Sequence, residues 1–204
     1  IEIERTQSVD TPYGAPSDVV RIGQLAGERI VCLPRHGAAH TIPPHRINYR
    51  ANLWALRQLG CDRVIAVCAV GSIHADIQPA DIIIPHQIID YTRSREHTLY
   101  DEDLDEVVHI DFTEPYCESL RTALIKAAES LGVAAHPTAT YGATQGPRLE
   151  TAAEIDRMER DGCDIVGMTG MPEASIAREL GLCYAIIAVS ANNAAGRHSG
   201  PLEM

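Results

Sequence analysis

Short, almost entirely apolar runs alternate with helix-forming segments along the whole chain. The clearest run extends from Val64 to Val70, and a similar one extends from Cys183 to Val189. A continuous apolar run of this length is typical of a strand that is buried on both faces of a sheet. The alternation of such strands with helices predicts an α/β fold, a single domain whose mixed, mainly parallel β-sheet is flanked by helices.

Local signals predict where several elements begin and end. Asn48 is a good N-cap for a helix that reaches Leu59, and Gly60 follows as a stop. Thr151 and Glu154 have the spacing of a capping box, in a helix whose first turn carries Glu150 and Thr151. Further helices are expected at about 115–131 and 172–180, a β-hairpin at 19–34, and short strands at 81–85, 86–91, 139–141 and 165–166.

Length and charge limit the classes of function. The 204 residues suffice for one sizeable core, and the net charge of −11 argues against nucleic acid or an anionic membrane as a partner. No apolar run is long enough to span a bilayer and no secretory signal is visible, so we expect a cytoplasmic protein. The sequence begins at Ile1 rather than Met, and this expectation refers to the stretch shown alone.

Cysteine and histidine spacing gives no sign of a metal site. The six cysteines form no Cys-x-x-Cys pair and several lie in apolar runs, so we interpret them as reduced core thiols rather than disulfides or zinc ligands. His36 and His40 have helical i, i+4 spacing, but Gly37, Pro43 and Pro44 make that segment a poor helix. We therefore predict no metal.

Two polar turns lie where an α/β sheet collects ligands. One follows Thr144 and leads into the helix at 151, and the other, Gly167-Met168-Thr169-Gly170, follows a short apolar strand. Ligands of open α/β sheets bind at the carboxyl ends of strands and at helix N-termini. The segment from 144 to 171 is therefore the first candidate for a binding site.

The residues of these turns resemble a known family. The pattern Gln-Gly-Pro-Arg-Leu-Glu-Thr at 145–151, Val-Gly-Met-Thr at 166–169 and Pro-Glu at 172–173 resembles the trimeric purine nucleoside phosphorylases, and most of all the branch with methylthioadenosine and S-methyl-5′-thioinosine phosphorylases. The resemblance extends from 11 to 192. It implies that residues 1–204 form one nucleoside phosphorylase domain, without the family's N-terminal phosphate loop and C-terminal helix. It also implies a homotrimer that acts on a small nucleoside, with inorganic phosphate as co-substrate and no further cofactor.

The resemblance assigns phosphate binding to Arg35, His36, Thr169 and the backbone around Ala69. A guanidinium at a strand end offers a planar pair of donors to an oxyanion, and His36 adds a second donor. Each side chain also has a plain structural reading: a surface ion pair for Arg35, a turn histidine for His36 and a helix N-cap for Thr169.

The base and sugar are assigned to the two turns and the last strand. Met168 and Leu149 match sugar and substrate positions, although a methionine at a strand end is more often core. A 6-oxopurine offers an N1–H donor, which suits the carboxylate of Glu150, and an O6 acceptor, which suits the amide of Asn192. The family's adenine-specific members have aspartate at the position of Asn192 and a small hydroxyl residue at that of Glu150, so hypoxanthine or guanine is favoured. Taken singly, Glu150 is equally an acid near a helix start and Asn192 a turn residue.

The polar excursion at 92–113 completes the expected site. It is rich in Asp and Glu, lacks periodicity and reads as a long surface loop, and long loops are often functional or interfacial. By resemblance, His109 reaches a neighbouring subunit's 5′ pocket; a solvated loop histidine is the plain alternative. The expected reaction is phosphorolysis of S-methyl-5′-thioinosine. Methylthioadenosine phosphorylase, a general inosine/guanosine phosphorylase and a purine-binding module without turnover are the alternatives.

Overall fold

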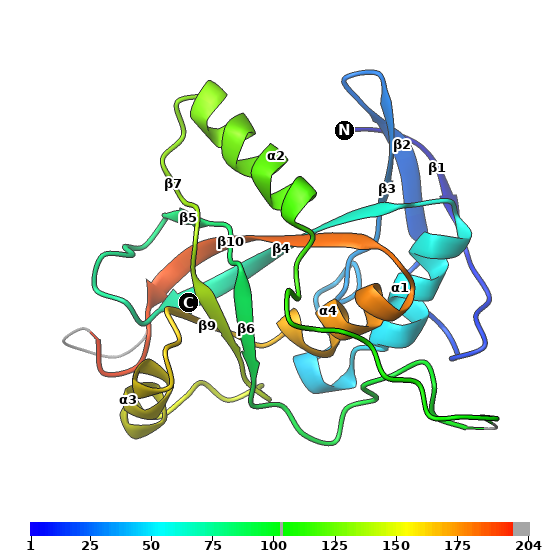
Figure 1. Cartoon of the computed structure of the whole chain (residues 1–204). Helices are drawn as coiled ribbons and strands as arrows, with labels where there is room; N and C mark the ends of the chain where they lie inside the picture. The colour runs from blue at the N-terminus through cyan, green and yellow to red at the C-terminus, as the bar shows by residue number, and fades with distance from the viewer. Residues whose placement is uncertain (103, 198–204) are drawn as a thin grey trace.

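A computed structural model describes residues 1–102 and 104–197 (Figure 1). A three-stranded antiparallel sheet contains β1 (Glu2–Gln7), β2 (Val20–Leu25) and β3 (Glu28–Cys32). The main sheet has seven strands in the order β6-β8-β9-β4-β10-β5-β7. Its strands are β4 (Arg63–Ser72), β5 (Ile82–Ile83), β6 (Gln87–Asp90), β7 (Ala135–His136), β8 (Thr140–Ala143), β9 (Ile165–Gly167) and β10 (Cys183–Asn193).

Strand pairing confirms the predicted fold class. The long strands β4 and β10 run parallel at the centre of the main sheet, and β5–β7, β6–β8 and β8–β9 are also parallel. The pairs β10–β5 and β4–β9 are antiparallel. The sheet is therefore mixed and mainly parallel. The hairpin expected at 19–34 forms, but as part of the separate small sheet, joined by β1, which the sequence analysis did not predict.

Helices lie on both sides of the long strands. They are α1 (Tyr49–Gln58), α2 (Glu118–Ser130), α3 (Ala152–Arg160) and α4 (Gly170–Glu179), with a 3-10 turn η1 (Pro44–Arg46) before α1. In the view of Figure 1, α2 lies above β10, whereas α1 and α4 lie below it. Buried side chains of β4, β8, β10, α1 and α4 form the main core.

The predicted helix caps are present. The Asn48 side chain accepts a hydrogen bond from the Ala51 N–H, and the Thr151 and Glu154 capping box is complete in both directions. Because Thr151 is the N-cap of α3, Glu150 lies before the helix and not in its first turn as expected. Its place in the site must therefore come from contacts other than the helix end.

The prediction that the apolar run at Val64 is buried on both faces is wrong. In β4 the side chains of Ala66, Cys68 and Val70 are buried, whereas Ile65 and Val67 are 48% and 63% exposed. Apolar composition reports what a side chain prefers. It does not report how many layers of the fold cover the strand.

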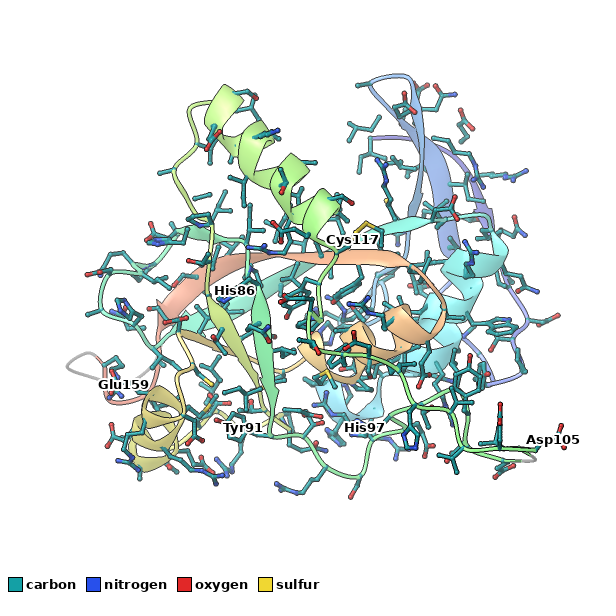
Figure 2. All side chains as sticks on the ribbon, viewed as in Figure 1. His86, Tyr91, His97, Asp105, Cys117 and Glu159 are labelled. Atoms are coloured by element: carbon teal, nitrogen blue, oxygen red, sulfur yellow. A yellow bond between two sulfur atoms is a disulfide. The ribbon has the colours of Figure 1, made fainter. Side chains whose placement is uncertain are left out.

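The expectation that every cysteine is reduced is also wrong. Cys117 and Cys183 form a disulfide, whose yellow bond lies beside the Cys117 label in Figure 2. Cys117 is the N-cap of α2 and its N–H donates to the Tyr184 carbonyl at 2.8 Å, so α2 begins beside the start of β10. This tertiary contact brings the two sulfurs together. The other cysteines, Cys32, Cys61, Cys68 and Cys163, are free thiols.

The described part of the excursion at 92–113 contains no helix or strand, as predicted. Asp105 lies near its tip, away from the sheets (Figure 2). Across the described residues, every helix is too short or too polar to cross a membrane.

Candidate active site

A cavity of about 530 Å³ opens where β4, β9 and β10 end. Its wall contains all the residues assigned to the site from the sequence except His109: Arg35, His36, Ala69, Leu149, Glu150, Met168, Thr169 and Asn192. Residues 40–44 and Pro147 complete the rim on one side. Folding therefore gathers side chains that are far apart in the chain around one space of ligand size.

Arg35 forms an ion pair, but the pair is largely buried and not at the surface, as the structural alternative for Arg35 would require. Its Nε and Nη2 donate to the two carboxylate oxygens of Glu173, each at 2.7 Å, and Nη1 donates to the Val67 carbonyl at 3.1 Å. The two side chains are 16% and 6% exposed. Burial alone would lower the pKa of Arg35, but Glu173, together with Cys68 and Tyr184, raises it, and the pKa lies well above its ordinary value. The cation that faces the cavity is thus already bonded to one anion.

His36 is held by a backbone contact. Its Nδ1 lies 2.8 Å from the Ile42 carbonyl, and its ring stacks on His40 with centroids 4.5 Å apart. A carbonyl only accepts, so Nδ1 carries the proton and Nε2 is an acceptor in the neutral ring. Burial lowers the pKa of His36, and the bond to Ile42 opposes this only partly. His36 can therefore donate through Nε2 only when it is protonated.

The turn after β9 presents Met168 and Thr169. Thr169 makes no side-chain cap to α4; its hydroxyl lies 3.5 Å from the Cys68 sulfur instead. The side chain of Met168 packs over Gly146, where an added Cβ would lie 2.4 Å from the methionine sulfur. Gly146 also has a φ of +58°, so both its backbone conformation and this close approach require glycine.

Glu150 and Asn192 lie on the same cavity wall but are held differently. The hydroxyl of Thr144 donates to the Glu150 carboxylate at 2.6 Å and also approaches the Gly167 carbonyl at 3.3 Å. Asn192 is in strand β10, not in a turn, and its backbone pairs with Gly71 of β4. The position where Gly71 would carry a Cβ lies 3.2 Å from Asn192 Oδ1, so glycine makes room for the amide.

His109 is the one assigned residue outside the cavity. It is exposed in the excursion and does not line the cavity in this single chain. The described residues contain no cluster of three or more His, Cys, Asp or Glu side chains suited to a metal ion.

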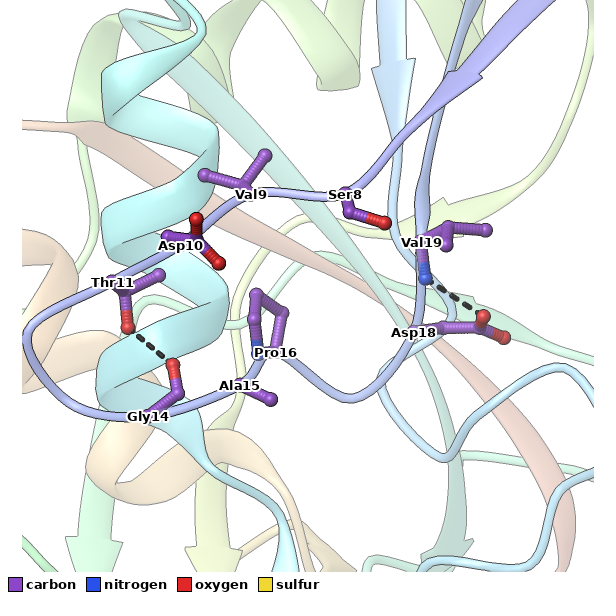
Figure 3. A pocket seen from close by; sticks show the side chains of 9 residues that line it. All are labelled: Ser8, Val9, Asp10, Thr11, Gly14, Ala15, Pro16, Asp18 and Val19. Carbon is purple, nitrogen blue, oxygen red and sulfur yellow. Dashed lines mark hydrogen bonds between the residues drawn. The ribbon is translucent and has the colours of Figure 1, made fainter.

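Two other hollows differ in chemistry. One, of about 450 Å³, shares Glu150 with the main cavity and is lined largely by ion-paired or polar side chains, such as Arg148 with Glu154. The other, of about 480 Å³, lies inside the loop at 8–19 (Figure 3). There Thr11 and Asp18 already bond to backbone groups of Gly14 and Val19. Neither hollow is lined by Arg35, Thr169 or Asn192.

Comparison with known proteins identifies the family of this chain. The sequence model described as the phosphorylase superfamily matches residues 2–204. The chain belongs to the phosphorylase superfamily. It is 51% identical to a Pseudomonas syringae protein called "Probable S-methyl-5′-thioinosine phosphorylase" over 100% of this chain and 83% of that protein. It is 50% identical to the 6-oxopurine nucleoside phosphorylase of Pyrococcus furiosus over 96% of this chain and 75% of that protein.

Solved structures of this superfamily share the fold. Methylthioadenosine phosphorylase from Schistosoma mansoni, in complex with adenine, superposes with a TM-score of 0.91 at 37% identity, covering 94% of this chain and 73% of that one. The same parasite's enzyme in complex with tubercidin gives a TM-score of 0.93 at 37% identity, covering 96% of this chain and 77% of that one.

Sequence reasoning missed residues that support the assigned ones. Glu173 was part of the Pro-Glu pattern but received no role, although it pairs with Arg35. Thr144 begins the segment that drew attention, yet its bond to Glu150 was not anticipated. Cys68 was interpreted only as a thiol of the hydrophobic core. A carboxylate four residues after Thr169 was the available signal for Glu173. No signal pointed to the contact between Cys68 and Thr169.

Proposed function

We propose that this enzyme cleaves S-methyl-5′-thioinosine with inorganic phosphate, giving hypoxanthine and 5-methylthioribose 1-phosphate. The observation that carries the proposal is that Glu150 and Asn192 line the same cavity as Arg35 and Thr169. One space then offers groups for a 6-oxopurine and groups for an oxyanion. Its relatives include proteins named for S-methyl-5′-thioinosine and for 6-oxopurine nucleosides, which supports the same base.

The proposed chemistry needs positioning more than acid–base catalysis. A phosphate oxygen forms a bond to C1′ while the C1′–N9 bond breaks and its electron pair leaves with the purine, through a transition state resembling an oxocarbenium ion. Glu150 accepts from N1–H, and the Asn192 amide donates to O6. When the departing purine takes up a proton from solvent at N7, the Asn192 carbonyl accepts from that N7–H. Together these bonds stabilise the base as it leaves.

Phosphate is proposed to bind between Arg35, His36, Thr169 and the Ala69 backbone. Because Arg35 is paired with Glu173, the guanidinium and carboxylate together carry no net charge. Attraction for phosphate then rests on directed donors, namely the remaining N–H groups of Arg35, the Thr169 hydroxyl, backbone N–H groups and protonated His36, rather than on an unpaired cation. Met168 and Leu149 would contact the sugar, and His109 would complete a neighbour's 5′ pocket in a homotrimer. Inorganic phosphate is the only co-substrate proposed, and the protein is proposed to be cytoplasmic.

A substrate panel tests the proposal. The full chain is incubated with methylthioinosine, methylthioadenosine, inosine, guanosine and adenosine, each with and without phosphate, and released base is quantified. We expect phosphate-dependent release, with the highest kcat/KM for methylthioinosine. Preference for methylthioadenosine would indicate a methylthioadenosine phosphorylase instead. Equally efficient use of inosine and guanosine would indicate a general 6-oxopurine nucleoside phosphorylase. Release without phosphate would indicate a hydrolase, and binding without release a purine-binding module.

A further inference from the structure

Arg95 is a buried arginine in a segment that otherwise reads as surface loop. It belongs to the polar excursion at 92–113, yet it is only 8% exposed. Within the described residues, the contacts of its guanidinium are with neutral oxygen atoms and not with a carboxylate. Burying a cation on these terms is costly unless its donors are well satisfied. Because this cost would not arise with an apolar side chain, the burial of the Arg95 guanidinium indicates a role other than filling space under the loop.

The guanidinium bonds to two separate turns. Nη1 donates to the carbonyls of Met168 and Met171 at 2.8 and 2.5 Å. Nη2 donates to the carbonyls of Thr144 and Gln145 at 3.1 and 2.8 Å, and Nε approaches the Gln145 side-chain oxygen at 3.3 Å. The Tyr49 hydroxyl oxygen lies 3.2 Å from Nη1 and shares one of its two N–H groups. One rigid planar group thus spans the turns that follow β8 and β9.

These turns carry the two halves of the cavity. The first begins with Thr144, whose hydroxyl bonds to Glu150, and the second presents Met168 and Thr169. At their starts the two segments are joined by the Thr144 N–H, which donates to the Gly167 carbonyl at 2.8 Å. The carbonyls of Gln145, Met168 and Met171 lie beyond the last paired residues of β8 and β9, and there Arg95 adds a second connection. We infer that Arg95 is a positioning residue that fixes the base-binding turn relative to the turn that binds sugar and phosphate. This inference rests on the proposed function.

The fork of arginine suits this task and lysine does not. Arginine presents five N–H donors in one plane, so it can bond in two directions at fixed separation, whereas lysine has a single nitrogen at the end of a flexible chain. A small error in the separation of two substrate-binding turns is expensive, because a misplacement of about 1 Å can cost roughly a hundredfold in rate. The plain alternative is that Arg95 only anchors the excursion to the domain.

Arg121 offers a matched control. It is also buried, at 5% exposure, and it also donates to backbone carbonyls, those of Pro85 at 2.9 Å and Pro137 at 2.6 Å. None of these residues lines the cavity. Arg95→Met and Arg121→Met remove the same group from comparably buried sites, although Arg121 also forms an ion pair with the exposed Glu118. Both substitutions should lower the melting temperature. A kinetic change found only in Arg95→Met is then a loss of positioning and not a result of lower stability.

The test compares KM and kcat of the two full-chain variants below their melting temperatures. We expect Arg95→Met to raise KM for both phosphate and nucleoside and to lower kcat/KM by about ten- to hundredfold, with Arg121→Met close to wild type. Thr144→Val should raise mainly the nucleoside KM, because the shorter of its two hydroxyl contacts, at 2.6 Å, is to Glu150. Guanidinium chloride at millimolar concentration should partly restore Arg95→Ala and leave wild type unchanged. If the Arg95 and Arg121 variants show equal kinetic changes, the inference is overturned.

A second measurement distinguishes failure of the proposed function from failure of the inference about Arg95. If wild type releases no base from any nucleoside, the same variants are compared by calorimetric titration with hypoxanthine and with phosphate. Weaker binding of both ligands to Arg95→Met, but not to Arg121→Met, would still support the positioning role. Unchanged binding would overturn it.

Discussion

Both carboxylate oxygens of Glu173 accept hydrogen bonds from the guanidinium of Arg35, at 2.7 Å each. The same carboxylate accepts from the buried Tyr184 hydroxyl at 2.9 Å. Arg35 is therefore at once a wall of the cavity and half of a largely buried ion pair. A substitution there changes folding stability and ligand binding together, and an experiment on phosphate binding must separate the two.

Arg35→Ala should destabilise the protein and weaken phosphate binding. It leaves Glu173 buried without its cation, which typically costs about 3–5 kcal/mol. The lost charge-assisted contact should cost about 1.5–3 kcal/mol in phosphate binding. The double variant Arg35→Ala/Glu173→Gln should recover much of the stability without recovering the phosphate KM. Chemical denaturation and phosphate kinetics measure the two effects; a wild-type phosphate KM in Arg35→Ala would remove Arg35 from the phosphate site.

His36 should make phosphate binding depend on pH. Its Nδ1–H is bonded to Ile42, and burial lowers its pKa below the ordinary value of 6.5, so its Nε2 becomes a donor only as the pH falls below that value. Phosphate KM should therefore decrease as the pH falls below the ordinary histidine pKa, and it should decrease more in wild type than in His36→Gln, whose amide donor does not titrate. Comparing the two proteins at each pH cancels the titration of phosphate itself. Parallel pH profiles would contradict a donor role for His36.

Asn192→Asp should reduce the preference for a 6-oxopurine. The carboxylate would lie against the O6 lone pairs of hypoxanthine, while it offers an acceptor to the N6 amino group of adenine. Mismatched hydrogen bonds in a buried site discriminate by large factors because a group is left unpaired. Glu150 would still oppose the unprotonated N1 of adenine, so only the double variant with Glu150→Ser should gain substantial adenine activity. The measurement is kcat/KM for methylthioinosine and methylthioadenosine. A wild-type preference for methylthioadenosine would refute the argument.

The exposed position of His109 leads to a prediction about assembly. We expect a homotrimer in which the excursion at 92–113 places His109 near a neighbour's cavity, because that histidine lies outside the cavity of its own chain. Light scattering should give a trimer mass at working concentration, and His109→Ala should raise the nucleoside KM with little change in melting temperature. A monomer mass would refute the prediction, and His97→Ala, at a partly exposed histidine of the same excursion, is the control.

The sequence by itself determined the alternation of strands and helices and several element ends. Asn48, Thr151 and Glu154 cap their helices as predicted, since these signals act over three residues or fewer. It also placed the candidate residues at the ends of strands, which meet at one edge of an α/β sheet. These inferences succeed because they depend on neighbours along the chain.

Only the tertiary structure decided which distant groups meet. Arg35 and Glu173 are 138 residues apart, Cys117 and Cys183 are 66 apart, and Arg95 reaches turns about fifty and seventy-five residues away. Local periodicity contains no information on such pairs, because each depends on how complete elements pack. The exposed face of β4 shows the same limit: its residues determine that it is apolar, and only the packing of layers determines whether it is covered.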